Sequence, residues 1–270
     1  MTALTFLRRR PPSRVRLAAV LQAVLLPVLF VAAWQVWAST LPPDSHAPSP
    51  TRVIQAFVAL TASGDLPSST LASLGRVLTG FSLALVAGVG LGTVMGMSRT
   101  MRASLDPIVE GFRPIAPMAI LPIAILWLGT GTPTALAIVS YAAFFPILLN
   151  TVMGVVKCDR KLLNAARTMG VPRRAILLRV VLPSASPSIM LGARLGMGVA
   201  WTAIIAAELA VGAKSGGGSS GGIGQMMFVF YSYSTDLNGI VVCMIVVGIV
   251  ALLIDRLFRL ADRHLMPWRH

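Results

Sequence analysis

The chain is poor in charged residues, and acidic residues are the rarest of them. Charged residues make up 12% of its 270 residues, whereas an average soluble domain carries roughly a quarter. Nine residues are Asp or Glu and 23 are Lys or Arg, so the formal net charge is +14. In a soluble protein this excess would suggest a nucleic-acid partner, but the basic residues here cluster at the ends of apolar runs. Because no zinc-finger spacing and no aromatic RNA-binding motif accompanies them, we exclude nucleic acid.

Cysteine and histidine are also scarce. The two cysteines, Cys158 and Cys243, fall in a basic segment and in the last apolar run, so neither a disulfide nor a metal cluster is predicted. The three histidines lie in loops or in the tail and are expected to be solvated: His46, His264 and His270. The sequence also lacks a complete phosphate-binding loop, a nucleophile elbow and a zinc-protease motif. We therefore expect no enzymatic activity and no cofactor in this chain.

Long apolar runs take the place of the missing charges. A helix needs about 20 mostly apolar residues to cross the hydrocarbon core of a bilayer. The stretch from Pro114 to Val156 is too long for one crossing, and the Gly and Pro residues at 129–133 divide it. Because backbone amides in lipid must bond internally, we predict an all-α membrane protein, a bundle of about six transmembrane helices. The predicted spans are 17–38, 77–97, 105–128, 134–155, 188–212 and 238–258.

The basic residues predict the orientation of this bundle. The apolar run at 17–38 follows five arginines, and at about 22 residues it exceeds the h-region of a cleaved signal peptide, so we expect an uncleaved first span. With the N-terminus in the cytoplasm, most Lys and Arg residues fall inside, whereas Arg52, Lys214 and the boundary residue Arg76 fall outside. The predicted organisation is a cytoplasmic N-terminus at 1–16, a transmembrane domain at 17–262 with a cytoplasmic loop at 156–187, and a cytoplasmic tail at 263–270.

Small residues recur every four positions in two of the predicted spans. Such spacing lines one helix face and lets another backbone approach closely. The pattern favours ordinary tight packing within one subunit, but a face that slides against its neighbour remains an alternative. The residues are Gly80, Ala84, Gly88, Gly92 and Gly96, and then Gly192, Gly196 and Ala200.

Two external segments lie between spans. Residues 47–63 carry an apolar stripe at helical spacing, which predicts a short helix on the membrane surface or on the bundle. Residues 215–224 read SGGGSSGGIG, which predicts a flexible loop that is slack and carries no site.

A few charged residues fall within the spans. Glu208 lies in the outer part of the fifth span, where a charge costs roughly 2.5–3.5 kcal/mol, so it should face a cavity or a partner. Arg194, near the inner end, can carry its charge back to water. Glu110 and Arg113 lie at the start of the third span and suit an i,i+3 ion pair. We regard Glu208, Arg113 and Glu110 as candidate residues of a translocation pathway, with helix-end anchoring as the alternative for the last two.

A basic segment at 158–183, CDRKLLNAARTMGVPRRAILLRVVLP, interrupts the spans. Asp159 is a suitable N-cap, Gly170 a suitable stop, and Pro172 suits the first turn of a second helix. Pro183 and Pro187 are expected to end that helix before the next span. Ala165 and Ala166 are small enough for the first helix to sit deep in a partner's groove. The segment is therefore either an interfacial hairpin or a docking element.

The spacing of Asn164-Ala165-Ala166, Gly170, Val180 and Leu182-Pro183 resembles the cytoplasmic signature of permease subunits in binding-protein-dependent ABC importers. That signature reads Glu-Ala-Ala, three residues, Gly, nine residues, Ile, one residue, Leu-Pro. Asn164 replaces the Glu, which removes a charge, and Val180 replaces the Ile. The residues at 73–81 resemble the opening of the family's second span. Further stretches resemble the nitrate, sulfonate, taurine and bicarbonate branch: 113–122, 143–147, 207–208 and 212–216.

The resemblance implies a type I ABC importer permease fold in a bacterial inner membrane. It implies a second permease subunit, an identical copy in the simplest case, two ATP-binding cassette ATPases that hold ATP and Mg²⁺, and an external solute-binding protein. It assigns ATPase coupling to Asn164, Ala165, Ala166, Gly170, Val180, Leu182 and Pro183. The expected solute is a sulfonate, nitrate, taurine or a related anion. Alternatives are a permease for a vitamin precursor or an aromatic acid, and a carrier that works without an ATPase, which would need paired ionisable residues or inverted repeats.

Overall fold

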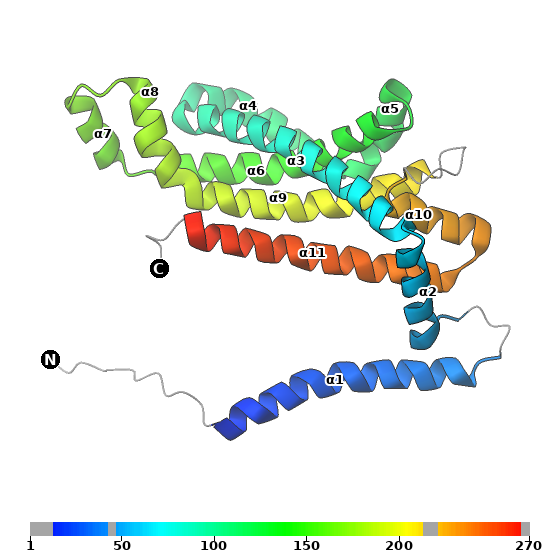
Figure 1. Ribbon diagram of the computed structural model, residues 1–270. Coiled ribbons are helices and arrows are strands. Elements are labelled where there is room, and N and C mark those ends of the chain that lie inside the picture. The colour runs from blue at the N-terminus through cyan, green and yellow to red at the C-terminus, as the bar shows by residue number, and fades with distance from the viewer. Residues whose placement is uncertain (1–12, 43–46, 213–220, 266–270) are drawn as a thin grey trace.

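The computed structural model describes residues 13–42, 47–212 and 221–265, and every regular element in these ranges is helical (Figure 1). The prediction of an all-α protein is therefore confirmed. Predictions for His46, His270, the side chain of His264, Lys214, most of segment 1–16, the first part of loop 215–224 and most of the tail lie outside the described residues. The elements are α1 (Ser13–Thr40), α2 (Pro50–Ala62), α3 (Asp65–Met97), α4 (Arg99–Phe112), α5 (Pro117–Leu128), α6 (Thr132–Val156), α7 (Arg160–Thr168), α8 (Arg173–Ile176), η1 (Leu177–Val181), α9 (Leu182–Val211), α10 (Ile223–Val229), η2 (Phe230–Ser234) and α11 (Leu237–Leu265).

The predicted spans correspond to helices of the bundle. In the described chain, four helices are long and apolar enough to cross a membrane: α3, α6, the continuous helix Arg173–Val211, and α11 over Leu237–Arg263. The pair α4 and α5 adds a fifth if it is counted as one span. The first predicted span falls on α1, whose described apolar part is the shorter stretch Leu25–Thr40.

The third span is bent, and the prediction of one helix over 105–128 is wrong in this respect. Helices α4 and α5 meet at 92°. Two prolines explain the break, because Pro114 lacks an N–H and Pro117 holds Ala116 in an extended conformation (φ −62°, ψ 136°). Tyr141 on α6 donates a hydrogen bond of 2.6 Å to the carbonyl oxygen of Phe112, which satisfies one acceptor at the broken end.

Helix α6 lies between α3 and α9, and the small residues explain the close approach. A Cβ atom built on Gly92 of α3 would lie 2.7 Å from Cβ of Thr151 and 2.9 Å from the carbonyl oxygen of Leu148. On the α9 side, a Cβ on Gly196 would lie 3.0 Å from the carbonyl oxygen of Ala143. Tight packing within the subunit therefore accounts for both stripes. The α6 residues opposite Gly80, Gly88, Gly92 and Gly96 repeat the same spacing of four: Val139, Ile147, Thr151 and Val155.

The helix that begins at Arg173 does not end at the prolines, contrary to expectation. It runs through Pro183 and Pro187 to Val211 as one helix of 39 residues. The π-helical segment η1 lies just before Pro183, and there the N–H of Leu182 bonds back five residues to the carbonyl oxygen of Leu177. Such a widened turn absorbs the change in hydrogen-bond register at a proline inside a helix. The second half of the basic segment 158–183 is thus continuous with the fifth span.

Helix α2 lies on the bundle and covers the N-terminal end of α11. Val53 is buried with Val242 and Cys243, whereas Phe57 and Ile54 are exposed. The helix predicted for 47–63 is therefore confirmed, but only part of its stripe faces the protein. Figure 1 shows α2 and α10 at one end of the bundle and α7 and α8 at the other.

Candidate functional site

The hairpin of α7 and α8 forms the first candidate site. The Asp159 carboxylate accepts a hydrogen bond of 2.8 Å from the Lys161 N–H and caps α7 as predicted. Gly170 has φ +74°, and the N–H groups of Gly170 and Val171 bond to the carbonyl oxygens of Arg167 and Ala166. This is the Schellman arrangement, in which a left-handed glycine ends the helix. Pro172 is the N-cap of α8 and stands one position before the first turn.

The two alanines of the hairpin differ in burial. Ala166 is buried against Val155, Ile176 and Val181 of the protein itself, so it does not belong to the exposed surface of α7. Ala165 is exposed. The reason is the helical period, because neighbouring positions on a helix lie about 100° apart and cannot both face the bundle.

An outward stripe on α7 continues from Ala165. Leu162 is 56% exposed and Met169, its C-cap, is 74% exposed. These three residues follow an i, i+3, i+7 pattern and share one helix face. We call them the outer stripe. Asn164 is exposed beside it, and a hydrogen bond of 3.0 Å from Thr168 reaches its backbone carbonyl oxygen.

The remaining signature residues lie where the hairpin joins α9. Val180 is half-buried and packs with the cluster that holds Ala166. Leu182 is half-buried and Pro183 exposed at the start of α9. The predicted coupling residues therefore fall into two groups. Asn164 and Ala165 are exposed on α7, whereas Ala166 and Val180 pack against the bundle.

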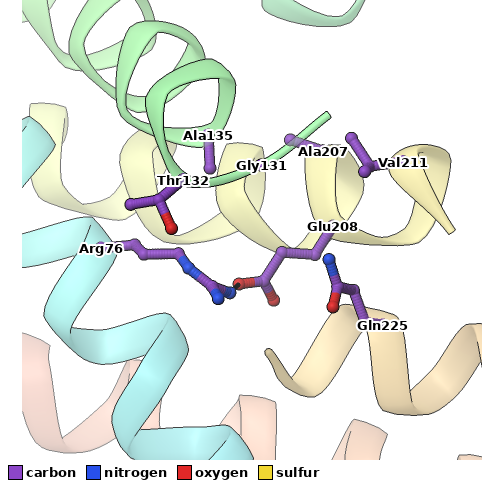
Figure 2. Close-up of a pocket in the computed structure, with 8 residues that line it drawn as sticks. All are labelled: Arg76, Gly131, Thr132, Ala135, Ala207, Glu208, Val211 and Gln225. Carbon is purple, nitrogen blue, oxygen red and sulfur yellow. Dashed lines mark hydrogen bonds and ion pairs between the residues drawn. The ribbon is translucent and has the colours of Figure 1, made fainter. Parts of the chain in front are cut away.

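A buried ionic cluster at the opposite end forms the second candidate site (Figure 2). The Glu208 carboxylate, 2% exposed, accepts a hydrogen bond of 2.6 Å from a guanidinium nitrogen of Arg76. The Ser73 hydroxyl donates to its other oxygen at 2.7 Å, and the Gly224 N–H donates to that oxygen at 3.1 Å. The Ser73 oxygen in turn accepts a hydrogen bond of 2.9 Å from the Ile223 N–H. We call these five groups, from α3, α9 and α10, the Glu208 cluster.

The cluster bears on the predictions for Glu208 and for the Gly/Ser-rich stretch. Glu208 was expected to face a cavity or a partner, and its partner is Arg76. The end of the Gly/Ser-rich stretch was expected to be slack, but Gly222, Ile223 and Gly224 are buried. A Cβ atom on Gly222 would overlap the Glu208 carboxylate, so only glycine lets this backbone approach. The pattern of the sequence did not reveal the role of Ser73, although it lies one turn before Arg76 on the same helix.

A small cavity adjoins the cluster. Its volume is about 20 Å³, which is room for about one water molecule. Figure 2 shows Thr132 and Gln225 beside the Arg76–Glu208 pair. In this conformation the cluster joins α3, α9 and α10 through hydrogen bonds. The cavity beside it is too small for a solute. The lining residues are Arg76, Gly131, Thr132, Ala135, Ala207, Glu208, Val211 and Gln225.

The other two pathway candidates do not join the cluster. Glu110 on α4 and Arg113 at its C-cap are exposed. Among the described residues no hydrogen bond or ion pair joins them to each other or to Glu208, so the predicted i,i+3 pair does not form. Arg194 is 40% exposed and so reaches water as expected, and it also lies 2.6 Å from Asp255 on α11.

Known proteins have sequences similar to this chain. The family model described as "Binding-protein-dependent transport system inner membrane component" matches residues 80–267. A putative ABC transporter permease protein of Methanocaldococcus jannaschii is 35% identical over 91% of each chain. The nitrate import permease protein NrtB of Synechocystis is 33% identical over 91% of this chain and 88% of that one. The taurine transport system permease protein TauC of Escherichia coli is 32% identical over 90% of this chain and 87% of that one. Permeases named for aliphatic sulfonates and for bicarbonate also match.

Solved structures show the same fold. A crystal structure of an amino acid ABC transporter with histidines matches with a TM-score of 0.61 at 12% identity, over 77% of this chain and 97% of that one. The family model covers more than half of the chain, and the relatives extend over most of their own lengths. The chain therefore belongs to the family of inner membrane components of binding-protein-dependent transport systems, as an ABC importer permease.

Proposed function

We propose that the chain forms the translocation pathway for a small anion of the sulfonate, nitrate or taurine class. The relatives named for nitrate, taurine, aliphatic sulfonates and bicarbonate support this solute class. Glu208, Glu110 and Arg113 remain our candidates for the pathway. Since Glu208 is paired with Arg76 here, a role of Glu208 in passage requires that the cluster opens during transport.

The outer stripe is the observation that supports an external source of energy. A helix that exposes Leu162, Ala165 and Met169 on one face, and packs Ala166 inward, is built to bury that face against another protein. The partner we infer is a separate ATP-binding cassette ATPase, which would bind ATP and Mg²⁺ outside this chain. Two permease subunits would pair above two ATPases, and a solute-binding protein would deliver the anion at the opposite end.

The continuous helix Arg173–Val211 supports a mechanical route between the two ends. It begins in the docking hairpin, crosses the bundle beside α6, and carries Glu208 near its far end. A displacement of the hairpin by the ATPase would therefore shift the α9 part of the Glu208 cluster relative to Arg76 on α3. Each nucleotide state must favour one arrangement through its own contacts, or transport would not be driven.

We place the protein in a bacterial inner membrane with both termini and the hairpin in the cytoplasm. The exposed arginines on the hairpin and at the inner end of α11 support this orientation, because basic residues concentrate in cytoplasmic loops. They include Arg167, Arg173, Arg174, Arg256 and Arg263.

Reconstitution of the full chain with a candidate ABC ATPase and a candidate solute-binding protein from the same genome tests the proposal. We expect proteoliposomes with ATP on the ATPase side to accumulate radiolabelled taurine, nitrate or an aliphatic sulfonate only when the binding protein is present. An ATPase variant that binds but does not hydrolyse ATP is the control. Uptake without ATP would show a carrier that needs no ATPase, whereas ATP-driven uptake of a vitamin precursor alone would refute the anion class and leave the permease assignment standing.

A further inference from the structure

A second, larger cavity lies where the docking hairpin meets the bundle. Its volume is about 220 Å³. Its floor is apolar and includes Met95 of α3 and Val181 of η1, and Cys158, just before α7, also lines it. No residue of the outer stripe or of the Glu208 cluster lines this cavity.

Three arginines line the cavity from two separate elements. Arg99 and Arg102 belong to the first turn of α4, and Arg167 belongs to the last turn of α7. Among the described residues that line it, none is acidic. The nearest carboxylate in an ion pair is Asp106, which lies 3.6 Å from Arg102 on the exposed side of α4. Asp106 thus pairs with one of the three arginines, and the Asp159 carboxylate next to Cys158 accepts a hydrogen bond from the Lys161 N–H at the start of α7.

The charge of the α4 first turn is opposite to what a helix start favours. The N-terminal end of a helix carries a partial positive charge, so acidic residues stabilise it and basic ones do not. Helix α4 has no acid in its first turn and carries Arg99 and Arg102 there. An anion between these arginines and Arg167 would relieve their mutual repulsion and the repulsion by the helix dipole.

The volume limits the size of this anion. Pockets for drug-sized ligands measure roughly 300–1,000 Å³, and this cavity is smaller, although it holds far more than one water. A phosphate-sized group fits, and the acyl chains of a lipid do not. Guanidinium groups suit such a group because they bind phosphate oxygens in a bidentate manner.

We propose that this cavity binds an anionic phosphoryl group, which joins α7 to α4 at the inner membrane surface. The group comes either from the headgroup of an anionic lipid or from soluble phosphate. Basic pockets between transmembrane helices on the cytoplasmic side bind lipid headgroups in this way. The site does not depend on the transported solute, so its test is independent of the proposed function.

Alkylation of Cys158 gives a direct readout, because this thiol lines the cavity and is 4% exposed. The full chain with Cys243→Ala is purified in detergent, and the rate of reaction with N-ethylmaleimide is measured with phosphatidylglycerol, phosphatidylcholine or inorganic phosphate. We expect phosphatidylglycerol to slow the reaction and phosphatidylcholine not to. In Arg99→Gln/Arg102→Gln the affinity for phosphatidylglycerol should fall roughly 20- to 30-fold, because each basic residue contributes about a factor of five.

Two further variants make the test decisive. Arg256→Gln/Arg263→Gln removes the same charge from exposed positions on α11 that do not line the cavity, and it should keep full protection. Arg167→Gln changes the hairpin side alone and should also weaken the protection of Cys158. It replaces the double variant if circular dichroism shows that the double variant does not fold. Protection by inorganic phosphate would identify a soluble ligand, and protection by phosphatidylglycerol alone a lipid. Equal protection by both lipids, no protection, or equal loss in the α11 variant would overturn the proposal.

Discussion

The Glu208 carboxylate and the Arg76 guanidinium lie 2.6 Å apart, although 132 positions separate them in the chain. The pair joins α3 to the C-terminal end of α9, whereas the hairpin precedes the start of α9. Both side chains are largely buried, at 2% and 16% exposed. A buried charge whose partner is removed is costly, so this contact predicts a strong and specific coupling between the two residues.

Glu208→Gln should lower the free energy of unfolding of the detergent-solubilised chain by about 3 kcal/mol, because it leaves the Arg76 charge buried without its carboxylate. Adding Arg76→Met should recover part of this loss. Thermal or denaturant unfolding of the two single variants and the double variant measures the coupling. Arg259→Gln is the control, since Arg259 is 63% exposed beside Asp255 and its loss should cost at most about 1 kcal/mol. Additive losses at Glu208 and Arg76 would contradict the pairing.

Ser73→Ala should loosen the start of α10. The Ser73 hydroxyl holds the Ile223 N–H and the Glu208 carboxylate at the same time, so its removal frees a buried amide. Hydrogen exchange at Ile223 and Gly224 should become about tenfold faster. Ser82→Ala removes a hydroxyl that bonds only within α3 and should leave those amides unchanged. Equal exchange in the two variants would remove Ser73 from the cluster.

Gly92→Ala should destabilise the bundle by roughly 1–3 kcal/mol through overpacking. Its Cβ would lie 2.9 Å from the Leu148 carbonyl oxygen, and a backbone atom cannot move aside as a side chain can. Gly90→Ala is the matched control two positions away, where nothing lies within 4 Å. Because alanine favours helix by about 1 kcal/mol over glycine, this second variant should melt at the same or a higher temperature. A lower melting temperature for Gly90→Ala would contradict the assigned face.

Ala166→Trp and Ala165→Trp separate folding of the hairpin from docking. Ala166 packs against Ile176 and Val181, so tryptophan there should disrupt the hairpin itself and increase its proteolysis. Ala165 is exposed, so tryptophan there should change stability by no more than about 0.5 kcal/mol but should prevent co-purification of the ATPase. An Ala165→Trp protein that retains both its ATPase and normal uptake would refute docking at the outer stripe.

Met169→Cys should report the side of the membrane on which the hairpin lies. Met169 is 74% exposed, whereas the native cysteines Cys158 and Cys243 are buried and should react slowly. In sealed right-side-out cells a bulky impermeant maleimide should leave the new cysteine unlabelled, and in inverted vesicles it should label it rapidly. Rapid labelling in the sealed cells would place the hairpin outside and refute the proposed orientation.

Local features of the sequence were sufficient to predict the hairpin in detail. The Asp159 cap, the left-handed Gly170 and the α7 helix between them depend on neighbouring residues and are all present. The effect of the prolines was harder to predict. Pro114 and Pro117 break α4 from α5, whereas Pro183 and Pro187 lie within a continuous helix. A proline inside a helix is tolerated only where a π turn and the packing around it satisfy the displaced groups, and both depend on tertiary structure.

The sequence alone also left open which helices would meet. It showed that Glu208 needed a partner, because a buried charge must be neutralised, but several basic residues could have served. The Gly/Ser-rich stretch before Ile223 was predicted to be a flexible loop because its composition is typical of linkers. A Cβ atom on Gly222 would overlap the Glu208 carboxylate, and one on Gly224 would lie 2.5 Å from the Ile205 carbonyl oxygen, so glycine suits both buried positions.

The amino-acid sequence by itself determined that the chain is a bundle of membrane-spanning helices with a capped hairpin between two of them. These features follow from hydropathy, helical period and capping, which act over a few residues at a time. Only the tertiary structure decided that Glu208 pairs with Arg76, that Ala166 turns inward, and that α6 lies between α3 and α9. Those contacts join residues far apart in the chain, and they depend on how whole helix surfaces fit together.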